Sequence, residues 1–486
     1  MQKEYKHGIE TERDSAITLS TVAAAVAQAV VGTAPVNLLS APEKAVNVPV
    51  LVTGRESMRE QLGMSTDYKN YTLMQTYLAS FQKVGAAPIV MVNVLDPNNV
   101  RHITVVASEE YTLTKGSLTV QDQGILLKSL IVSKGDDSVA EQDKDYVAAF
   151  DVDGNVMIAV TDSGILAGEE RIRVAYSKLN PAGVTPEDIM GGKGEDGRKT
   201  GIALFDEIYS RFQIVPAILS APEYSQIPAV AAALETKAEL VGDLTSAVAV
   251  IDIESSDTGS LEKVRDAKDK LGALSRMDVL CWPRVVIAGN VISASAVQAA
   301  MLQYAIAGNN NVPASIDNMA VPIDGIALED GTQLYFTQRE INDNLNAYGV
   351  NSFINMGGWK CWGSNSAAYP DKTDPNDRFI KCVMIGNYLE NRFKTEYLSQ
   401  VGRDASLKFV ESLVGNFNVT LNALVPDYLA GAEVIFDKDE NTMSQLLEGH
   451  FRFHTRYADY TPAGYIVNRF TWDSKILQDA LTGGEK

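Results

Sequence analysis

The feature of this sequence that most constrains its fold is an alternation between continuous apolar runs and segments of helical period. Residues 46–53 and 88–95 are apolar runs, and residues 70–84 between them carry apolar side chains at spacings of three and four. Continuous apolar runs are typical of strands covered on both faces, as in parallel sheets. The order strand, helix, strand therefore predicts an α/β fold with a parallel sheet, to which residues 17–31 also contribute.

The same alternation returns after a long interruption. Predicted helices alternate with predicted strands over residues 201–212, 214–219, 226–241, 247–253, 261–271, 279–288 and 293–307. Between the two parts, residues 98–197 break into short β-branched runs separated by turn residues. The dipeptide Asp153-Gly154 between alternating segments is a strong hairpin signal. We predict a discontinuous, mixed α/β core domain (21–97 and 198–348) with an inserted all-β domain (98–197).

A further α/β domain is predicted at residues 349–463. Two short aromatic runs, 352–356 and 359–362, meet at Gly357-Gly358, which suits the positive φ angles of a tight hairpin turn. The pair Asn376–Asp377 stands where a helix N-cap belongs, before a periodic segment that continues to residue 400. Later patterns predict helices at 405–421 and 441–447 and strands at 432–436 and 450–457.

Both ends of the chain lack the features of a packed domain. Residues 1–20 have no helical period and few apolar groups, which predicts an N-terminal extended arm. Residues 464–486 form the predicted C-terminal arm, in which residues 465–472 alternate like a strand after a Pro-Ala-Gly hinge. Strands that cannot satisfy their backbone amides within their own core normally pair with a sheet edge on another molecule.

The composition is that of a folded protein of several domains. The 486 residues are 45% hydrophobic and 21% charged, and the formal net charge is −20. This charge disfavours binding to nucleic acid or to an anionic bilayer, since both would repel the chain. Three scattered cysteines indicate buried core thiols in a reducing cytoplasm, with neither a disulfide framework nor a CxxC zinc site. The apolar run 22–31 is too short for a membrane span or secretion signal.

Two local patterns suggest ligand sites, and each has a simpler interpretation. Residues 191–200, GGKGEDGRKT, resemble a phosphate loop, but Arg198 separates the last glycine from Lys199 and no apolar strand precedes the run. A flexible linker is the favoured interpretation. Residues Asp437, Asp439, Asn441 and Glu448 match positions of a calcium loop, but Thr442 replaces the required glycine. Asn441 or Thr442 is more simply the cap of a helix over 443–447.

Histidine offers little further chemistry. The spacing of His450 and His454 suits a metal site on a helix, but a strand at 450–457 would hold these side chains about 13 Å apart. With four histidines in the whole chain, no Ser/His/Asp or Cys/His set can be assembled. We therefore predict no catalytic residues, no metal site and no cofactor.

The stretch around the glycine pair resembles a known family. The order Gly-Trp-Lys-Cys-Trp-Gly, a polar loop with prolines, and Arg378-Phe379 before a long helix is similar to the contractile tail sheath proteins of phages and phage-like injection machines. Further matching signatures are Gly32-Thr33-Ala34-Pro35, Thr200-Gly201, and residues 216–222 and 457–462. The resemblance covers most of the chain except residues 98–197.

This resemblance implies a structural, self-assembling protein and not an enzyme. Its copies would stack as rings around an inner tail tube and contract, with an inner tube protein, baseplate proteins and tail terminator proteins as partners. It implies assembly in the cytoplasm of the producing bacterium into a virion tail or phage-like particle. It also implies that both arms complete a sheet in adjacent subunits. The candidate intersubunit residues are Tyr5, Ile9, Tyr465, Ile466, Val467, Asn468, Arg469, Phe470 and Trp472.

The alternative is a cytosolic α/β enzyme or small-ligand binding protein, because such sheets often carry sites at the carboxyl ends of their strands. The absence of a glycine fingerprint and of an acid/base set from the sequence weighs against this alternative.

Overall fold

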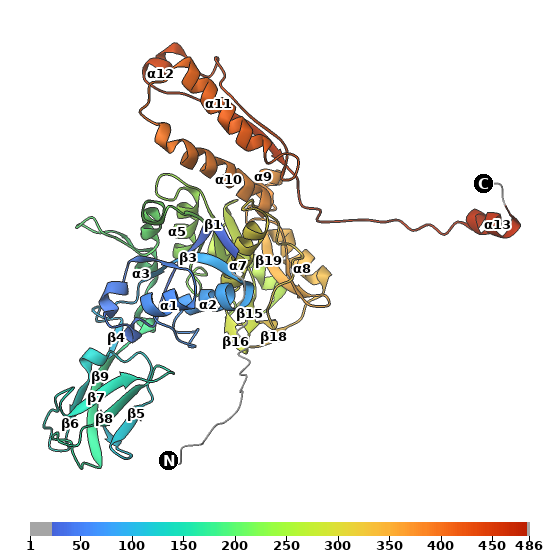
Figure 1. Cartoon of the computed structure of the whole chain (residues 1–486). Helices are drawn as coiled ribbons and strands as arrows, with labels where there is room; N and C mark the ends of the chain where they lie inside the picture. The colour runs from blue at the N-terminus through green and yellow to red at the C-terminus, as the bar shows by residue number, and fades with distance from the viewer. Residues whose placement is uncertain (1–21, 484–486) are drawn as a thin grey trace, which may run out of the picture.

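The computed structural model describes residues 22–483, and its centre is an eight-stranded sheet (Figure 1). The strand order is β2-β3-β1-β12-β13-β14-β19-β20. The strands from β3 to β19 pair in parallel, whereas the edge strands β2 and β20 pair antiparallel with their neighbours. Their bounds are β1 (Val22–Gly32), β2 (Pro49–Val52), β3 (Ala86–Asn93), β12 (Val215–Ser220), β13 (Val248–Asp252), β14 (Asp278–Cys281), β19 (Val350–Asn355) and β20 (Trp359–Trp362).

The central helix of this body is α7 (Ala294–Gly308), which packs across β1, β3, β12, β13 and β14. Nearly all of its side chains are buried, as expected of a helix that is apolar on every side. The other helices of the body are α1 (Arg55–Gln61), α2 (Leu73–Tyr77), α3 (Pro186–Met190), α4 (Ile208–Phe212), α5 (Pro228–Glu239), α6 (Val264–Leu271) and α8 (Gln338–Asn344).

Residues 103–179 form two three-stranded antiparallel sheets with a separate hydrophobic core. One sheet contains β4 (Ile103–Thr112), β9 (Arg171–Leu179) and β6 (Ile131–Ser133), and the other contains β5 (Ser117–Val120), β8 (Val156–Val160) and β7 (Tyr146–Phe150). The predicted turn at Asp153-Gly154 connects β7 to β8 and is confirmed, with a φ of 84° at Gly154. The two ends of this β-rich part lie side by side, as shown by the Asn180 amide, which donates to the His102 carbonyl at 2.7 Å.

The last part of the fold is a C-terminal lobe, residues 380–459, that stands away from the body (Figure 1). It contains two long helices, a two-stranded antiparallel sheet and a short helix at its tip. These elements are α10 (Ile380–Tyr397), α11 (Leu407–Asn422), β21 (Leu429–Ile435), α12 (Met443–Leu447) and β22 (His454–Asp459). Beyond β22 an extended segment projects from the molecule and ends in α13 (Ser474–Thr482). No helix within residues 22–483 is long and apolar enough to cross a membrane.

Several expectations from the sequence are confirmed by these elements. The hairpin at Gly357-Gly358 joins β19 to β20, and the helix expected at 293–307 is α7. All three cysteines are buried. The helix expected at 70–84 is α2 followed by a wider π-helical turn, and it ends at Gly85 with a φ of 82°.

Other expectations were wrong in detail. The strand near residue 50, β2, was expected to run parallel to β3, but it is antiparallel to it. The parallel partner of β3 is β1, so the crossover connection joins β1 to β3. The strand expected at 279–288 is two strands, β14 and β15 (Arg284–Ile287), because Pro283 has no amide to continue the ladder. β15 belongs to a second sheet with β16 (Asn290–Ile292), β17 (Gly325–Ala327) and β18 (Gln333–Leu334).

The C-terminal half also holds corrections. The cap expected at Asn376–Asp377 is Asp374, whose carboxylate accepts from the Asn376 amide and begins the short helix α9 (Pro375–Arg378). Phe379 is extended and separates α9 from α10. The strand expected at 450–457 begins only at His454, and α13 was not expected.

Candidate assembly surface

The predicted intersubunit strand, residues 465–472, has no strand partner in the part of the chain that the structure describes. Residues 465–472 form no strand with any part of residues 22–483, and every one of them is exposed. The exposed fractions of the large side chains are 88% for Tyr465, 84% for Ile466, 70% for Val467, 89% for Phe470 and 78% for Trp472. So many exposed apolar groups on one short segment indicate a surface that is covered in use.

The remaining candidate residues divide into two groups. Asn468 and Arg469 are exposed and lie in the same extended segment as the apolar side chains. Tyr5 and Ile9 lie outside the described residues.

The C-terminal arm starts from a fixed point. The Lys381 ammonium group on α10 donates to the Asp459 carboxylate at 2.8 Å and to the Tyr460 carbonyl at 2.6 Å. Both side chains of this pair are largely buried, at 14% and 5% exposure for Lys381 and Asp459. Removing one partner would leave a buried charge unpaired, so the end of β22 is held firmly against α10.

One edge of the β21–β22 sheet is closed by a side chain. The Asn418 amide group on α11 accepts from the Val434 N–H and donates to the Val434 carbonyl, both at 2.9 Å. An asparagine side chain carries one acceptor and two donors, so it imitates the two hydrogen bonds of a neighbouring strand. The outer edge of β21 is therefore blocked at Val434, one residue before the strand ends.

The other edge of the sheet, along β22, is open. The N–H and C=O groups of Val434 point away from β22, and residues opposite each other in an antiparallel pair have the same orientation, so those of its partner Thr455 point away from β21. Because this orientation repeats every second residue, the N–H and C=O groups of Tyr457 also point outward. These outward amides and carbonyls meet no partner within residues 22–483. An exposed row of unpaired backbone groups is a template for strand addition.

Beneath this sheet lies a cluster of aromatic rings that makes the surface rigid. Phe393 on α10 packs edge to face on Phe417 of α11 with ring centroids 5.0 Å apart, and it also contacts Tyr397 and Phe453. Gly386 of α10 lies against Tyr457, since a Cβ there would approach the Tyr457 hydroxyl to 2.8 Å. The sheet thus packs on α10 without space for a larger residue at 386.

Asparagine side chains join the lobe to the body. The Asn391 side chain accepts from the Ser246 amide and donates to the Ser246 carbonyl, both at 2.7 Å. The Asn387 side chain donates to the Ala247 carbonyl at 3.1 Å. Both asparagines are buried on α10, and the backbone they contact leads directly into β13. The long helix of the lobe is therefore tied to the central sheet.

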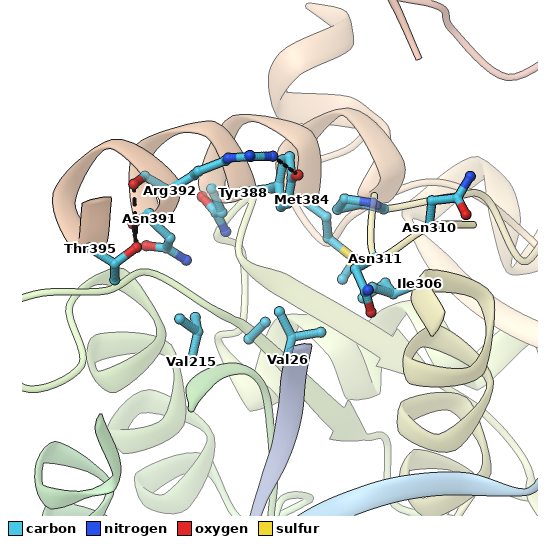
Figure 2. A pocket seen from close by; sticks show the side chains of 13 residues that line it. Val26, Val215, Ile306, Asn310, Asn311, Met384, Tyr388, Asn391, Arg392 and Thr395 are labelled. Carbon is cyan, nitrogen blue, oxygen red and sulfur yellow. Dashed lines mark hydrogen bonds between the residues drawn. The ribbon is translucent and has the colours of Figure 1, made fainter. Parts of the chain in front are cut away.

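A pocket of about 330 Å³ opens beside this junction. Figure 2 shows Val26 and Val215, from strands β1 and β12, facing Tyr388 and Arg392 on α10. The Arg392 guanidinium donates to the Tyr388 hydroxyl at 2.8 Å and to the Glu396 carboxylate at 2.6 Å. Because these polar groups already satisfy one another, the pocket presents a mainly apolar wall and no set of groups for acid/base chemistry.

The carboxyl ends of the parallel strands, where an α/β enzyme would bind its substrate, are filled by paired side chains. The Glu223 carboxylate after β12 forms two bonds of 2.5 Å with the Arg284 guanidinium and accepts a third from Gln75. Asp252 at the end of β13 is buried against the hydroxyl groups of Ser225 and Ser295. Burial raises the pKa of Asp252. These groups stabilise the junction of strands and α7 by contacting one another.

A second buried acid lies at the start of β14. The Asp278 side chain is fully buried, and Glu235 and Glu239 on α5 are its neighbouring charges. Burial, with a smaller effect from these like charges, raises the pKa of Asp278 to about 8. Burial therefore favours the neutral, protonated form of this carboxyl group.

The candidate metal residues of the lobe have structural roles. The Asn441 side chain bonds the Asp437 carbonyl and both backbone groups of Arg452, which closes the loop before β22. Thr442 caps α12 in a capping box with Gln445, as one of the two sequence alternatives predicted. Within residues 22–483, no group of three His, Cys, Asp or Glu side chains is arranged to hold a metal ion.

The histidine geometry differs from the expectation. His454 opens β22 and lies 3.3 Å from Glu440, whereas His450 precedes the strand and lies 3.7 Å from Glu448. The spacing argument that assumed both residues on one strand was therefore wrong, although both side chains point to acidic neighbours at the surface.

No protein-family model matches the sequence. The tail sheath protein of Burkholderia phage BcepMu is 24% identical over 500 residues, which cover 99% of this chain and 98% of the relative. The fold is similar to the contracted helical sheath of the anti-feeding prophage, with a TM-score of 0.54 and 14% identity over 97% of this chain and 100% of that one. It is also similar to the contracted PVC sheath complex of an extracellular contractile injection system, with a TM-score of 0.56 and 12% identity over 98% and 100%.

Proposed function

Because the chain belongs to the family of contractile tail sheath proteins, we propose that its copies stack as rings around an inner tail tube and shorten to drive that tube through a target envelope. The protein is a structural sheath subunit. Its proposed partners are further copies of itself, an inner tube protein, and baseplate and tail terminator proteins. Assembly would take place in the cytoplasm of the producing bacterium, into a virion tail or phage-like particle.

The observation that supports the assembly proposal is that one chain presents both an exposed extended segment and an open sheet edge among its described residues. Residues 465–472 are extended and expose their apolar side chains, while the outer edge of β22 offers backbone groups without partners in the described chain. Adding the segment of one copy to β22 of another satisfies both sets of backbone groups. The aromatic cluster under β22 keeps this edge in place.

This contact joins two different surfaces, so it is heterologous. A heterologous contact repeats from copy to copy and gives rings or helical filaments instead of closed dimers. Asn418 occupies the outward backbone groups of Val434 on β21, whereas no side chain within residues 22–483 occupies those of Thr455 and Tyr457 on β22, so β22 is the proposed acceptor edge. The N-terminal arm, residues 1–20, is proposed to take part in the same sheet.

Electron microscopy and sedimentation of a chain that ends at Ala463 test this proposal. The shortened chain should unfold at the same temperature as the full chain, because residues 464–483 are all exposed in the isolated subunit. It should form no tubes under conditions in which the full chain assembles. Normal tubes from the shortened chain would contradict the proposal.

A further inference from the structure

The C-terminal helix α13 packs against no other element within residues 22–483. All nine of its residues are exposed, and the exposed fractions reach 70% for Ile476, 50% for Leu477 and 77% for Leu481. These residues and Ala480 lie along one side of the helix, while Lys475, Gln478 and Asp479 lie on the other. A nine-residue helix is marginally stable in water on its own, so its amphipathic pattern indicates that it docks on a surface.

The lobe contains a groove of matching character. A groove of about 780 Å³ runs between the end of α10, the start of α11 and the helix α12. Apolar side chains from all three helices line it, and several remain exposed, including Leu398, Val401 and Leu447 at 49%, 81% and 81%. Arg403, Lys394 and Asp404 lie at the same groove and could pair with the charges of α13. A fourth helix laid in this groove would complete a helical layer.

The strand geometry gives the direction in which a donated arm would run. Pairing along β22 adds to a two-stranded antiparallel sheet, and a uniform antiparallel order is favoured over a mixed one. An arm antiparallel to β22 has its C-terminal end beside His454, where β22 begins. Phe451 and Phe453, just before that point, line the groove. Such an arm therefore brings α13 directly to the groove.

The lengths agree with this path. Residues 465–472 span about 26 Å when extended, which slightly exceeds the six residues of β22 at about 20 Å. Asp473 then caps α13, its carboxylate accepting from the Lys475 amide at 2.8 Å, so the helix starts where the strand would leave the sheet.

We propose that α13 is donated together with the arm strand and docks, apolar face inward, in the groove between α10, α11 and α12 of a second copy of this chain. The inference rests on the proposed strand exchange and adds a second, side-chain-specific contact to it. We assign the occupant as a second copy because the arm of the described chain leaves the lobe beside Lys381, at the start of α10, and does not fold back toward its own groove. In Figure 1 the arm points away from the tip that carries α12.

Disulfide cross-linking in the full-length chain tests this docking. The native cysteines are buried, so new surface thiols would react selectively. A chain carrying Leu477→Cys is mixed with a chain carrying Leu447→Cys during assembly, and the mixture is then oxidised. We expect a disulfide-linked product at twice the chain mass. Matched controls are Gln478→Cys on the polar face of α13 and Met443→Cys, which is exposed on α12 outside the groove.

Assembly of charged variants gives a second readout. Leu477→Asp should lower the sedimenting fraction at least about tenfold, since it places a charge against an apolar wall, whereas Gln478→Asp should leave that fraction unchanged. Both residues are exposed in the described part of the subunit, so both variants should fold normally.

The outcomes separate this inference from the strand exchange itself. If Val467→Pro abolishes tubes while Leu477→Asp does not, and Leu477→Cys and Leu447→Cys form no cross-link, the docking of α13 is wrong and the strand exchange stands. A third chain carries both Leu477→Cys and Leu447→Cys. If its disulfide forms within one chain and not between chains, the inference is also overturned. If Val467→Pro, Ile466→Pro and Leu477→Asp all leave assembly unchanged, both proposals fail.

Discussion

At the scale of single residues, asparagine side chains make the connections that organise the lobe. Asn418 occupies the backbone groups of Val434, Asn391 occupies those of Ser246, and Asn441 joins the loop before β22. Each provides a donor and an acceptor in one planar group, as a strand neighbour would. Their effect is to satisfy backbone groups of a sheet edge, of the body and of a loop that have no strand neighbour.

The first prediction concerns a single amide of the arm. Val467→Pro removes one backbone donor and stiffens the segment, so it should weaken tubes strongly while the melting temperature of the subunit stays unchanged. A loss of about 1 kcal/mol per contact is repeated at every copy of a tube, which amplifies it. Sedimentation of assembled protein measures the effect.

Two variants complete this test. Val467→Thr keeps the amide and the β-branched shape and should assemble normally. Successive backbone amides point in opposite directions along a strand. If the 467 amide faces away from the ladder, the 466 amide faces it, and Ile466→Pro should then weaken tubes instead. Wild-type tube yields from both proline variants would show that no strand is donated here.

A second residue-scale prediction concerns Asp278. Its pKa is raised to about 8 by burial from an ordinary value of 3.8, so the folded state binds more protons than the unfolded state between these two values. The stabilising contribution is present at low pH and is lost as pH rises through about 8, with a slope of at most about 1.4 kcal/mol per pH unit.

Asp278→Asn should therefore flatten this dependence, because the amide is neutral throughout. Urea unfolding of the subunit at pH 6 and pH 9 measures it. Equal pH slopes in the wild type and in Asp278→Asn would show that Asp278 does not titrate in this range.

At the scale of elements, the sequence predicted the helices and hairpins that follow from local periodicity. It did not predict features that depend on residues far apart in the sequence. The central helix α7 and the hairpin at Gly357-Gly358 follow from local patterns, and both are confirmed. The antiparallel direction of β2 depends on which strand begins the crossover, which no local pattern records. The closing of the β21 edge by Asn418 likewise could not be predicted, because residues 418 and 434 are adjacent only in the folded lobe.

The same distinction applies to the candidate site. The alternation of residues 465–472 and their hinge pointed to the arm before its exposure was known. The helix α13 was missed although Asp473 is a good cap and Ile476, Leu477 and Leu481 have helical spacing. That pattern would have revealed it.

The boundary of the inserted β-sheets yields an element-scale prediction. Ile103 pairs with Leu179 where the chain enters and leaves, and Leu179, Val184 and Ile189 belong to the main hydrophobic core. A deletion of residues 98–197 would remove these core side chains. Replacing residues 104–178 with Gly-Ser-Gly should instead leave the body folded, because the two ends are already neighbours.

Thermal unfolding measured by circular dichroism distinguishes the outcomes. A single cooperative transition within a few degrees of the full chain is expected. A broad or absent transition in the shortened chain would show that the inserted sheets are needed for the body to fold.

At the scale of the whole molecule, the subunit consists of a body, a lobe tied to it, and an arm whose residues 465–472 join no sheet within residues 22–483. The body is filled at the strand ends by pairs such as Glu223 and Arg284, so its buried charges stabilise the fold. The arm and the β22 edge are the complementary unsatisfied parts. In the extended sheath, such exchanged arms would keep neighbours linked while the rings rearrange into a shorter, more stable stack.

The most direct test is a cryo-electron microscopy map of tubes assembled from the full-length chain, in which residues 460–473 can be traced from their own lobe. We expect residues 465–472 to lie against β22 of a different copy and to form a third strand beside Thr455 and Tyr457. Continuous density that folds this segment back onto its own lobe, with β22 of the neighbour left uncovered, would show that no strand is exchanged.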